Sequence, residues 1–177
     1  MENAFETNGE ILLGKTYPID YKIKNSGNSA HFCRFYIQKY FTDSDGNKTS
    51  DLPASLIELG INEDDWLIQD SLTTDERIVI YYKYKIFPGD TISSGINSIK
   101  LSDSILKVVD RVETTDENGY KNIDMNFMFN KANLNLKIEF NYVQDFSTPE
   151  TGETLFKEVW GANVTVSSDC STILSVE

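Results

Sequence analysis

Apolar and polar residues alternate along most of the chain, and this alternation is the strongest structural signal in the sequence. A period of two places one set of side chains on each face of a β-strand. The longest run covers residues 134–142, where large apolar residues alternate with Asn, Lys and Glu. Similar runs predict further strands at residues 19–24, 32–41, 77–87, 123–129 and 162–166. Residues 96–101 are expected to form another strand or an ordered connection that leads into residues 104–112.

Turn-forming residues separate these runs. They occur at residues 25–28, 43–47, 88–90 and 116–119, where Asn, Asp, Gly and Pro gather. One face of each amphipathic strand has to be buried. We therefore predict that the core includes the following apolar-face residues: Tyr21, Ile23, Phe35, Ile80, Tyr82, Phe127, Leu136, Ile138 and Phe140.

One segment, residues 149–160, has the pattern of an α-helix. Thr148 is placed to cap its N-terminus, Pro149 suits the first helical position, and Gly161 suits the end. Residues 52–59 are expected to form a short helix or turn.

The order of these elements predicts an all-β fold with one short helix near the C-terminus. About seven or eight strands separated by short turns favour a two-sheet β-sandwich of jelly-roll-like topology. A parallel α/β fold is poorly supported, because too few helices are present for the crossovers. We expect a single β-sandwich domain over residues 1–177, with residues 1–18 as an N-terminal segment and residues 167–177 as a C-terminal tail.

The net charge of the chain disfavours some classes of binding partner. The chain has 28 acidic and 16 basic residues and a formal net charge of -12, which disfavours binding to nucleic acids or to anionic membranes. A run of about 18 apolar residues, the length needed to cross a bilayer, is missing, so we expect no membrane insertion. Residues 1–6 lack the basic and apolar regions of a secretory signal, so we expect the signal of an exported protein to be absent from this chain.

Residues with catalytic or metal-binding chemistry are few. His31 is the sole histidine, which excludes a Cys/His zinc cage and an H-E-x-x-H site. Cys33 and Cys170 either form a disulfide or are a buried thiol and a loop thiol. The D-x-D-G pattern at residues 43–47 is read as an Asp-Gly turn, since the later Glu of a calcium loop is missing. The acidic residues 63–65 form a solvated loop or, alternatively, a surface cation site. We assign no catalytic, cofactor-binding or metal-binding residue.

Several short motifs, in consistent order from about residue 22 to residue 166, together resemble those of one protein family. They are KIKNSGNSA at residues 22–30, FCRFYI at 32–37, KYFTD at 39–43, DW at 65–66, IYYKY at 80–84, FPGDT at 87–91, IEFNYVQ at 138–144 and VWGANV at 159–164. On these motifs the chain resembles the TasA/camelysin-like family, a group of exported Gram-positive proteins that depend on the SipW-type signal peptidase and include BsaA-like biofilm matrix proteins.

This resemblance implies a structural role rather than a catalytic one. Members of the group are secreted subunits of extracellular biofilm matrix fibres, in which a strand donated by one subunit completes the next. The resemblance thus implies self-association, with matrix or cell-surface proteins as further partners, and a location in the extracellular matrix or at the cell surface. The metalloprotease label that camelysin has carried is disfavoured here, because one histidine cannot supply the usual ligand set. The alternative is an exported binding module that recognises carbohydrate or protein.

The segment of residues 3–13 is the candidate for the donated strand. Its apolar residues are Phe5, Ile11, Leu12 and Leu13, and Gly9 and Gly14 can act as hinges. The other interpretation is an ordinary first strand or a frayed end. Family members usually have one or two extended segments before the motif at residues 22–30, so the chain is either truncated at its N-terminus or a diverged member.

Overall fold

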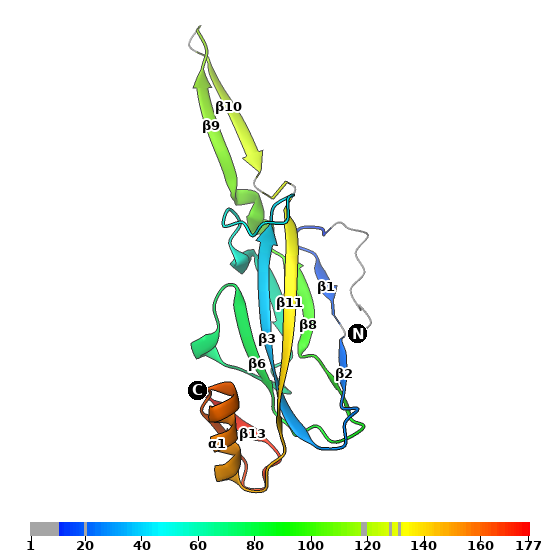
Figure 1. Cartoon of the computed structure of the whole chain (residues 1–177). Helices are drawn as coiled ribbons and strands as arrows, with labels where there is room; N and C mark the ends of the chain where they lie inside the picture. The colour runs from blue at the N-terminus through cyan, green and yellow to red at the C-terminus, as the bar shows by residue number, and fades with distance from the viewer. Residues whose placement is uncertain (1–10, 20, 118–119, 128, 131) are drawn as a thin grey trace.

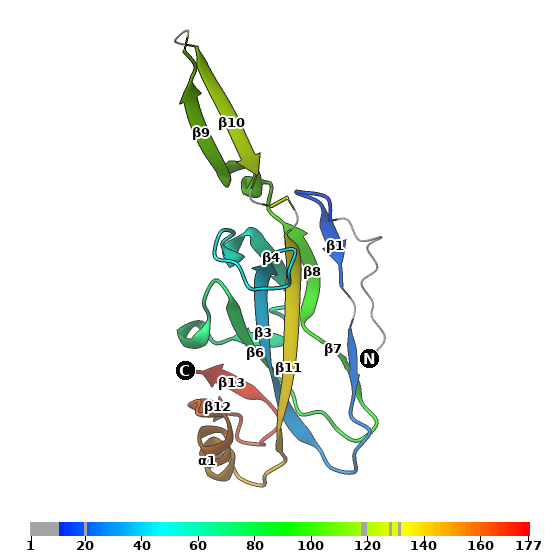
Figure 2. The ribbon, with the colours of Figure 1, turned by 45° about the horizontal axis from the view of Figure 1, so that its top comes forward.

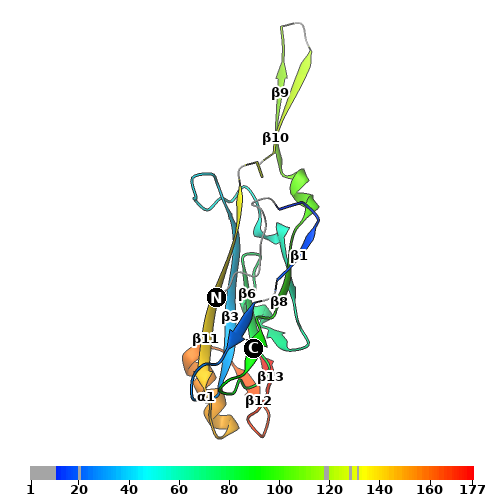
Figure 3. The ribbon, with the colours of Figure 1, turned by 90° about the vertical axis from the view of Figure 1, so that its right-hand side faces the viewer.

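The computed structural model describes residues 11–19, 21–117, 120–127, 129–130 and 132–177. It shows an elongated body of two β-layers, with a β-hairpin at one end and an α-helix at the other (Figure 1). Figure 3 shows the two layers from the side. The predicted donor segment lies outside the described residues as far as residue 10, and so does the tip of the turn predicted at residues 116–119.

The first layer is a four-stranded antiparallel sheet in the order β11-β3-β6-β5. Its strands are β3 (His31–Thr42), β5 (Trp66–Ile68), β6 (Arg77–Tyr82) and β11 (Asn133–Gln144). The two longest strands, β3 and β11, pair along their whole length, from Thr42 opposite Asn133 to His31 opposite Gln144. β11 is the outermost strand on its side of this sheet.

The second layer is made of shorter antiparallel strands. β8 (Ile96–Leu101) lies between β1 (Thr16–Pro18) and β4 (Ile57–Ile61), and β2 (Lys22–Lys24) pairs with β7 (Thr91–Ser93). β1 and β2 follow one another along the outer edge of this layer. The chain crosses between the layers repeatedly, which confirms the predicted jelly-roll-like β-sandwich.

The main core lies between the layers. Its centre is Trp66, which stacks on Phe35 with ring centroids 5.0 Å apart. Gly95 has φ +79°, and a Cβ atom there would lie 2.7 Å from the Trp66 ring. The position therefore needs glycine both for its backbone conformation and for space.

A second core covers the outer face of the four-stranded sheet at one end. It is formed by α1 (Pro149–Trp160) and the antiparallel pair β12 (Val164–Val166) and β13 (Ile173–Val176) (Figure 2). The Thr148 hydroxyl accepts a hydrogen bond from the Thr151 amide, and Gly161 ends the helix at φ 66°, as the sequence predicts. Residues 167–177 were expected as a tail, but they contain β13, whose Ile173 is buried.

Arg34 fastens the end of this helix to the sheet. Its guanidinium donates a hydrogen bond of 2.8 Å to the Trp160 carbonyl and one of 3.3 Å to the Tyr81 hydroxyl. It also lies over the ring of Tyr36, 4.5 Å from the centroid. The polar face predicted for this strand is thus covered where the helix lies on it, and a buried cation is held by aromatic rings and neutral oxygen atoms.

The third part of the structure is a hairpin, β9 (Val109–Thr115) and β10 (Lys121–Phe127). Its strands pair antiparallel with each other and project beyond the body (Figure 1). Three 3₁₀ turns occur in the connections that the structure describes, at Ala54–Leu56, Asp70–Leu72 and Asp103–Lys107. The last of these turns follows β8, so residues 96–101 form a strand rather than an ordered connection.

The residues predicted for the core fall into three groups. Phe35 and Ile80 are buried, as predicted. Phe127 is half-buried on the hairpin, and for Phe140 the prediction is wrong, because 39% of its surface is exposed. The others are half-buried and pack against the main core: Tyr21, Ile23, Tyr82, Leu136 and Ile138.

The two cysteines lie in different cores. Cys33 is buried between the layers, whereas Cys170 is buried in the core under the helix. Both thiols are free, so the disulfide alternative is wrong. Burial raises the pKa of the Cys33 thiol far above its ordinary value.

The close packing of the helix predicts a specific sensitivity at Gly152. A Cβ atom there would lie 2.2 Å from the Phe146 ring. We expect Gly152→Ala to lower the free energy of unfolding by about 1–3 kcal/mol through overpacking, although alanine is the better helix former. Urea unfolding checks this, with Glu153→Ala on the exposed side of the same helix as control. An unchanged or higher stability for Gly152→Ala would contradict the helix placement.

Candidate functional site

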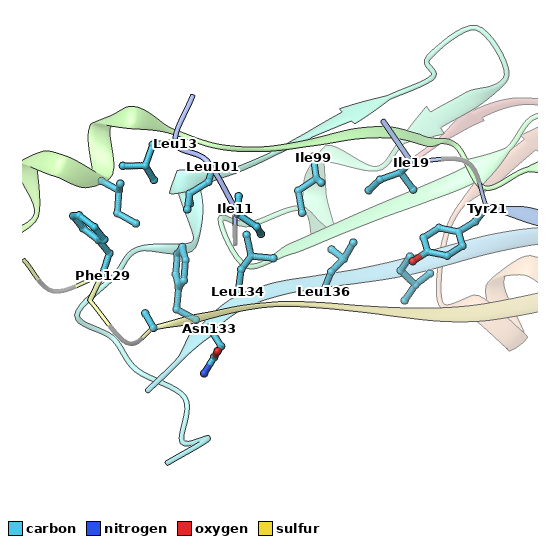
Figure 4. A pocket seen from close by; sticks show the side chains of 14 residues that line it. Ile11, Leu13, Ile19, Tyr21, Ile99, Leu101, Phe129, Asn133, Leu134 and Leu136 are labelled. Atoms are coloured by element: carbon cyan, nitrogen blue, oxygen red, sulfur yellow. The ribbon is translucent and has the colours of Figure 1, made fainter. Parts of the chain in front are cut away.

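An apolar groove runs along the open side of the sandwich, between β11 and the edge formed by β1 and β2. Its upper part, nearer the hairpin, is a cavity of about 560 Å³. Figure 4 shows its side chains converging from both layers, with Leu134 and Leu136 opposite Ile19 and Ile99. Most of the side chains that line it are apolar. The lining residues are Ile11, Leu13, Ile19, Tyr21, Phe41, Ile99, Leu101, Ile105, Phe129, Ala132, Asn133, Leu134, Leu136 and Ile138.

The groove continues toward the helix end of the molecule. This lower part is a cavity of about 480 Å³ that shares Tyr21, Leu136 and Ile138 with the upper part. It adds Ile23 and Phe140 to the apolar lining, and Lys22 and Lys24 stand at its rim. The two parts therefore form one continuous groove.

The alternation in the two bordering strands builds this groove. In β11, every second residue from Leu134 to Phe140 lines it. Across the opening, Ile19, Tyr21 and Ile23 follow the same period of two. A strand inserted between β11 and β2 would have a row of apolar side chains on each side. Both rows would match its own side chains in spacing, because all strands share the same two-residue period.

The backbone at the borders of the groove is that of sheet edges. β11 pairs with β3 on one side, and β1 and β2 pair with β8 and β7 on one side. Within the described ranges, no strand pairs with the other side of any of the three. Such edges offer amide and carbonyl groups that can bind a further strand.

Residues 11–13 close the upper end of the groove of their own chain. Ile11 and Leu13 point into the cavity (Figure 4). The Gly14 amide donates a hydrogen bond of 2.8 Å to the Leu101 carbonyl, and the Leu12 amide donates one of 2.8 Å to the Tyr17 hydroxyl. The part of the predicted donor segment that the structure describes is therefore attached next to the groove.

The upper part of the groove offers mainly apolar side chains for contact. The lining of its upper part contains no carboxylate, imidazole or amine among the described residues. Its chemistry is that of apolar burial, worth roughly 25 cal/mol per Å².

The residues that the sequence singled out for their chemistry lie elsewhere. The His31 ring lies tilted against the Tyr142 ring, with ring centroids 5.2 Å apart, and partial burial lowers the pKa of His31. Cys33, on the same strand, is sealed in the core and does not form a site with it. The Asp43 carboxylate accepts hydrogen bonds from the Asp45 and Asn47 amides, at 2.9 and 2.8 Å, so the Asp-Gly turn is confirmed.

The acidic residues 63–65 lie in a turn that is closed by a lysine. The Lys83 ammonium donates to the carbonyls of Glu63 and Asp64, each at 2.7 Å. Across the described ranges, no group of three or more His, Cys, Asp or Glu side chains has the arrangement of a metal site.

The sequence did not single out the groove. Ile99, Leu101, Ile105 and Phe129 come from separate parts of the chain and carry no motif. The apolar row of β11 was the available signal, but alternation cannot show that its strand lies at an edge.

Comparison with protein families, with curated proteins and with solved structures found no match. Among the residues that the structure describes, no helix has the length and apolar character needed to cross a membrane.

Two neighbouring phenylalanines allow a test of whether the groove is open to solvent. Phe35 and Phe140 are opposite one another on β3 and β11, with ring centroids 5.5 Å apart, yet they are 2% and 39% exposed. We expect Phe35→Ala to lower the free energy of unfolding by about 3–5 kcal/mol and Phe140→Ala by less than about 2 kcal/mol. Urea unfolding of both variants measures the difference, and equal losses would show that the groove is closed in solution.

Proposed function

We propose that the protein is a structural subunit of an extracellular biofilm matrix fibre, in which the groove of one subunit accepts a strand from the next. The observation that carries the proposal is the apolar groove bounded by two unpaired sheet edges among the described residues. The resemblance of the sequence to TasA/camelysin-like proteins supports secretion and the matrix location.

The dimensions of the groove suit an extended segment. The β11 row from Leu134 to Phe140 is about 20 Å long at the rise of a strand, which accommodates six or seven residues. Backbone hydrogen bonds to the edge of β11 would supply affinity, and the alternating apolar positions would supply specificity. In the upper part, the polar groups of the lining side chains that could orient a small-molecule substrate are the Asn133 amide and the Tyr21 hydroxyl.

The donor segment of this proposal is residues 3–13. Its last residues, Ile11 and Leu13, already lie in the upper end of the groove of their own chain. In the fibre, residues 3–13 would leave this position and enter the groove of a neighbour. Such an exchange is heterologous, because the donor surface and the acceptor surface differ, and it repeats without closing on itself.

Proline variants test donation by this segment. Proline removes a backbone donor and restricts φ, so we expect Ile11→Pro and Leu13→Pro to reduce fibre formation more than the matched Ile11→Ala and Leu13→Ala variants. A deletion through Leu13 should abolish fibres. Negative-stain electron microscopy of the secreted protein and its variants gives the readout, and thermal unfolding of each monomer shows whether the fold is kept. Unchanged fibres from all five variants would exclude this segment as the donor.

A second candidate function is carbohydrate binding. The part of the four-stranded sheet that the helix leaves uncovered holds a polar cavity of about 800 Å³. It is lined by Gln38, Tyr40, Lys48, Arg77 and Asn135, among others. An aromatic ring such as that of Tyr40, with side-chain amides and positively charged groups around it, is suited to binding a sugar. A protein that stays monomeric under all assembly conditions but binds a glycan through Tyr40 would favour this function.

A further inference from the structure

The hairpin β9–β10 is not supported by the rest of the body. Its strands pair with each other, and no other strand of the described chain pairs with either of them. Figures 1 and 3 show it projecting past both layers. A two-stranded hairpin is at best marginally stable in water by itself. Its length and position therefore indicate a contact outside the subunit.

One face of the hairpin is apolar along β10. Ile123, Met125 and Phe127 lie on it in every second position, with Ile123 49% and Met125 56% exposed. Opposite them on β9 stand Glu113 and Arg111, which form an ion pair with each other. Residues 109–127 contain five acidic and two basic side chains, so the hairpin as a whole is acidic.

The base of the hairpin lies at the upper end of the groove. Phe127 contacts Phe129, with ring centroids 5.5 Å apart. Phe129 lines the groove beside Leu13 (Figure 4). The base of the hairpin and residues 11–13 of the donor segment thus lie at the same end of the groove.

The opposite end of the groove presents a matching surface. There the β11 row becomes increasingly exposed, from Phe140 at 39% to Tyr142 at 61%, and the two rings are 6.1 Å apart. Lys22 and Lys24 of β2 stand at the rim beside Phe140. Exposed apolar side chains and positive charge therefore meet at this end, whereas exposed apolar side chains and negative charge meet on the hairpin.

We propose that the hairpin of one subunit packs against the lower end of the groove of a second copy. The apolar face of β10, formed by Ile123, Met125 and Phe127, would lie on Phe140 and Tyr142. This inference rests on the proposed fibre function and names a second contact between the same two copies. The contact joins opposite ends of the molecule, so it is heterologous and extends a filament rather than closing a dimer. The acidic hairpin and the rim lysines add electrostatic attraction, which orients the encounter.

Disulfide trapping between two different variants tests the contact. Met125→Cys places a thiol on the hairpin and Tyr142→Cys places one at the lower end of the groove, while the native cysteines are buried. We expect an equimolar mixture of the two, oxidised under assembly conditions, to give a covalent dimer in amounts about tenfold above either variant alone, because only the mixture brings unlike ends together. Met125→Cys mixed with Val159→Cys is the control, since Val159 is 55% exposed on the helix.

A charge reversal gives a second readout. We expect Lys24→Glu to raise the protein concentration needed for fibres by about tenfold, whereas Lys157→Glu on α1 should leave it unchanged. Fibres that form normally without dimer trapping, and with Lys24→Glu unchanged, would overturn the hairpin contact while the fibre function stands. A protein that forms no fibres under any condition would overturn both.

Discussion

The long strand β3 is the constraint on which the rest of the structure depends. It is hydrogen-bonded on both sides, to β11 and to β6, and it is covered on both faces where α1 lies over it. Phe35 and Ile37 face the layer of shorter strands, while Phe32 and Arg34 face the helix. Because β11 pairs with β3 over twelve residues, it is held in place by its neighbour even though its own free edge is open. The groove exists because one of its borders, β11, is held in place by β3. The opposite border, formed by β1 and β2, consists of short strands that belong to the other layer.

Sequence patterns were sufficient to predict the class of fold, the helix with its caps, and the faces of most strands. They could not separate Phe35 from Phe140, since both lie in runs of the same period. Alternation reports which side chains share a face, whereas burial depends on the strand that packs against that face. For the same reason Phe127 of β10 was predicted as part of the core, although it belongs to a projecting hairpin. Arg34 is the opposite case, a charged residue on a predicted polar face that the helix covers, and its partners come from residues far apart in the sequence.

The candidate site was harder to predict than the fold, and the reason is its chemistry. Catalytic and metal sites depend on a few side chains with characteristic spacing, which a sequence displays directly. A groove for a strand depends on backbone edges and on apolar residues that look like any others. The groove exists because β1, β2 and β11 are each paired on one side only among the described residues. A sequence does not record which edge of a strand stays unpaired. The motifs that suggested a fibre protein could therefore point to the type of assembly without naming a residue that performs it.

The separation of the two thiols has a consequence for how such a fibre would hold together. Cys33 and Cys170 lie on opposite sides of one sheet, and both are sealed from solvent. Neither is placed to bridge one subunit to another. The mechanical strength of the polymer would then come from interlocked strands and apolar contacts, so reducing agents would leave it intact while agents that compete for backbone hydrogen bonds would take it apart.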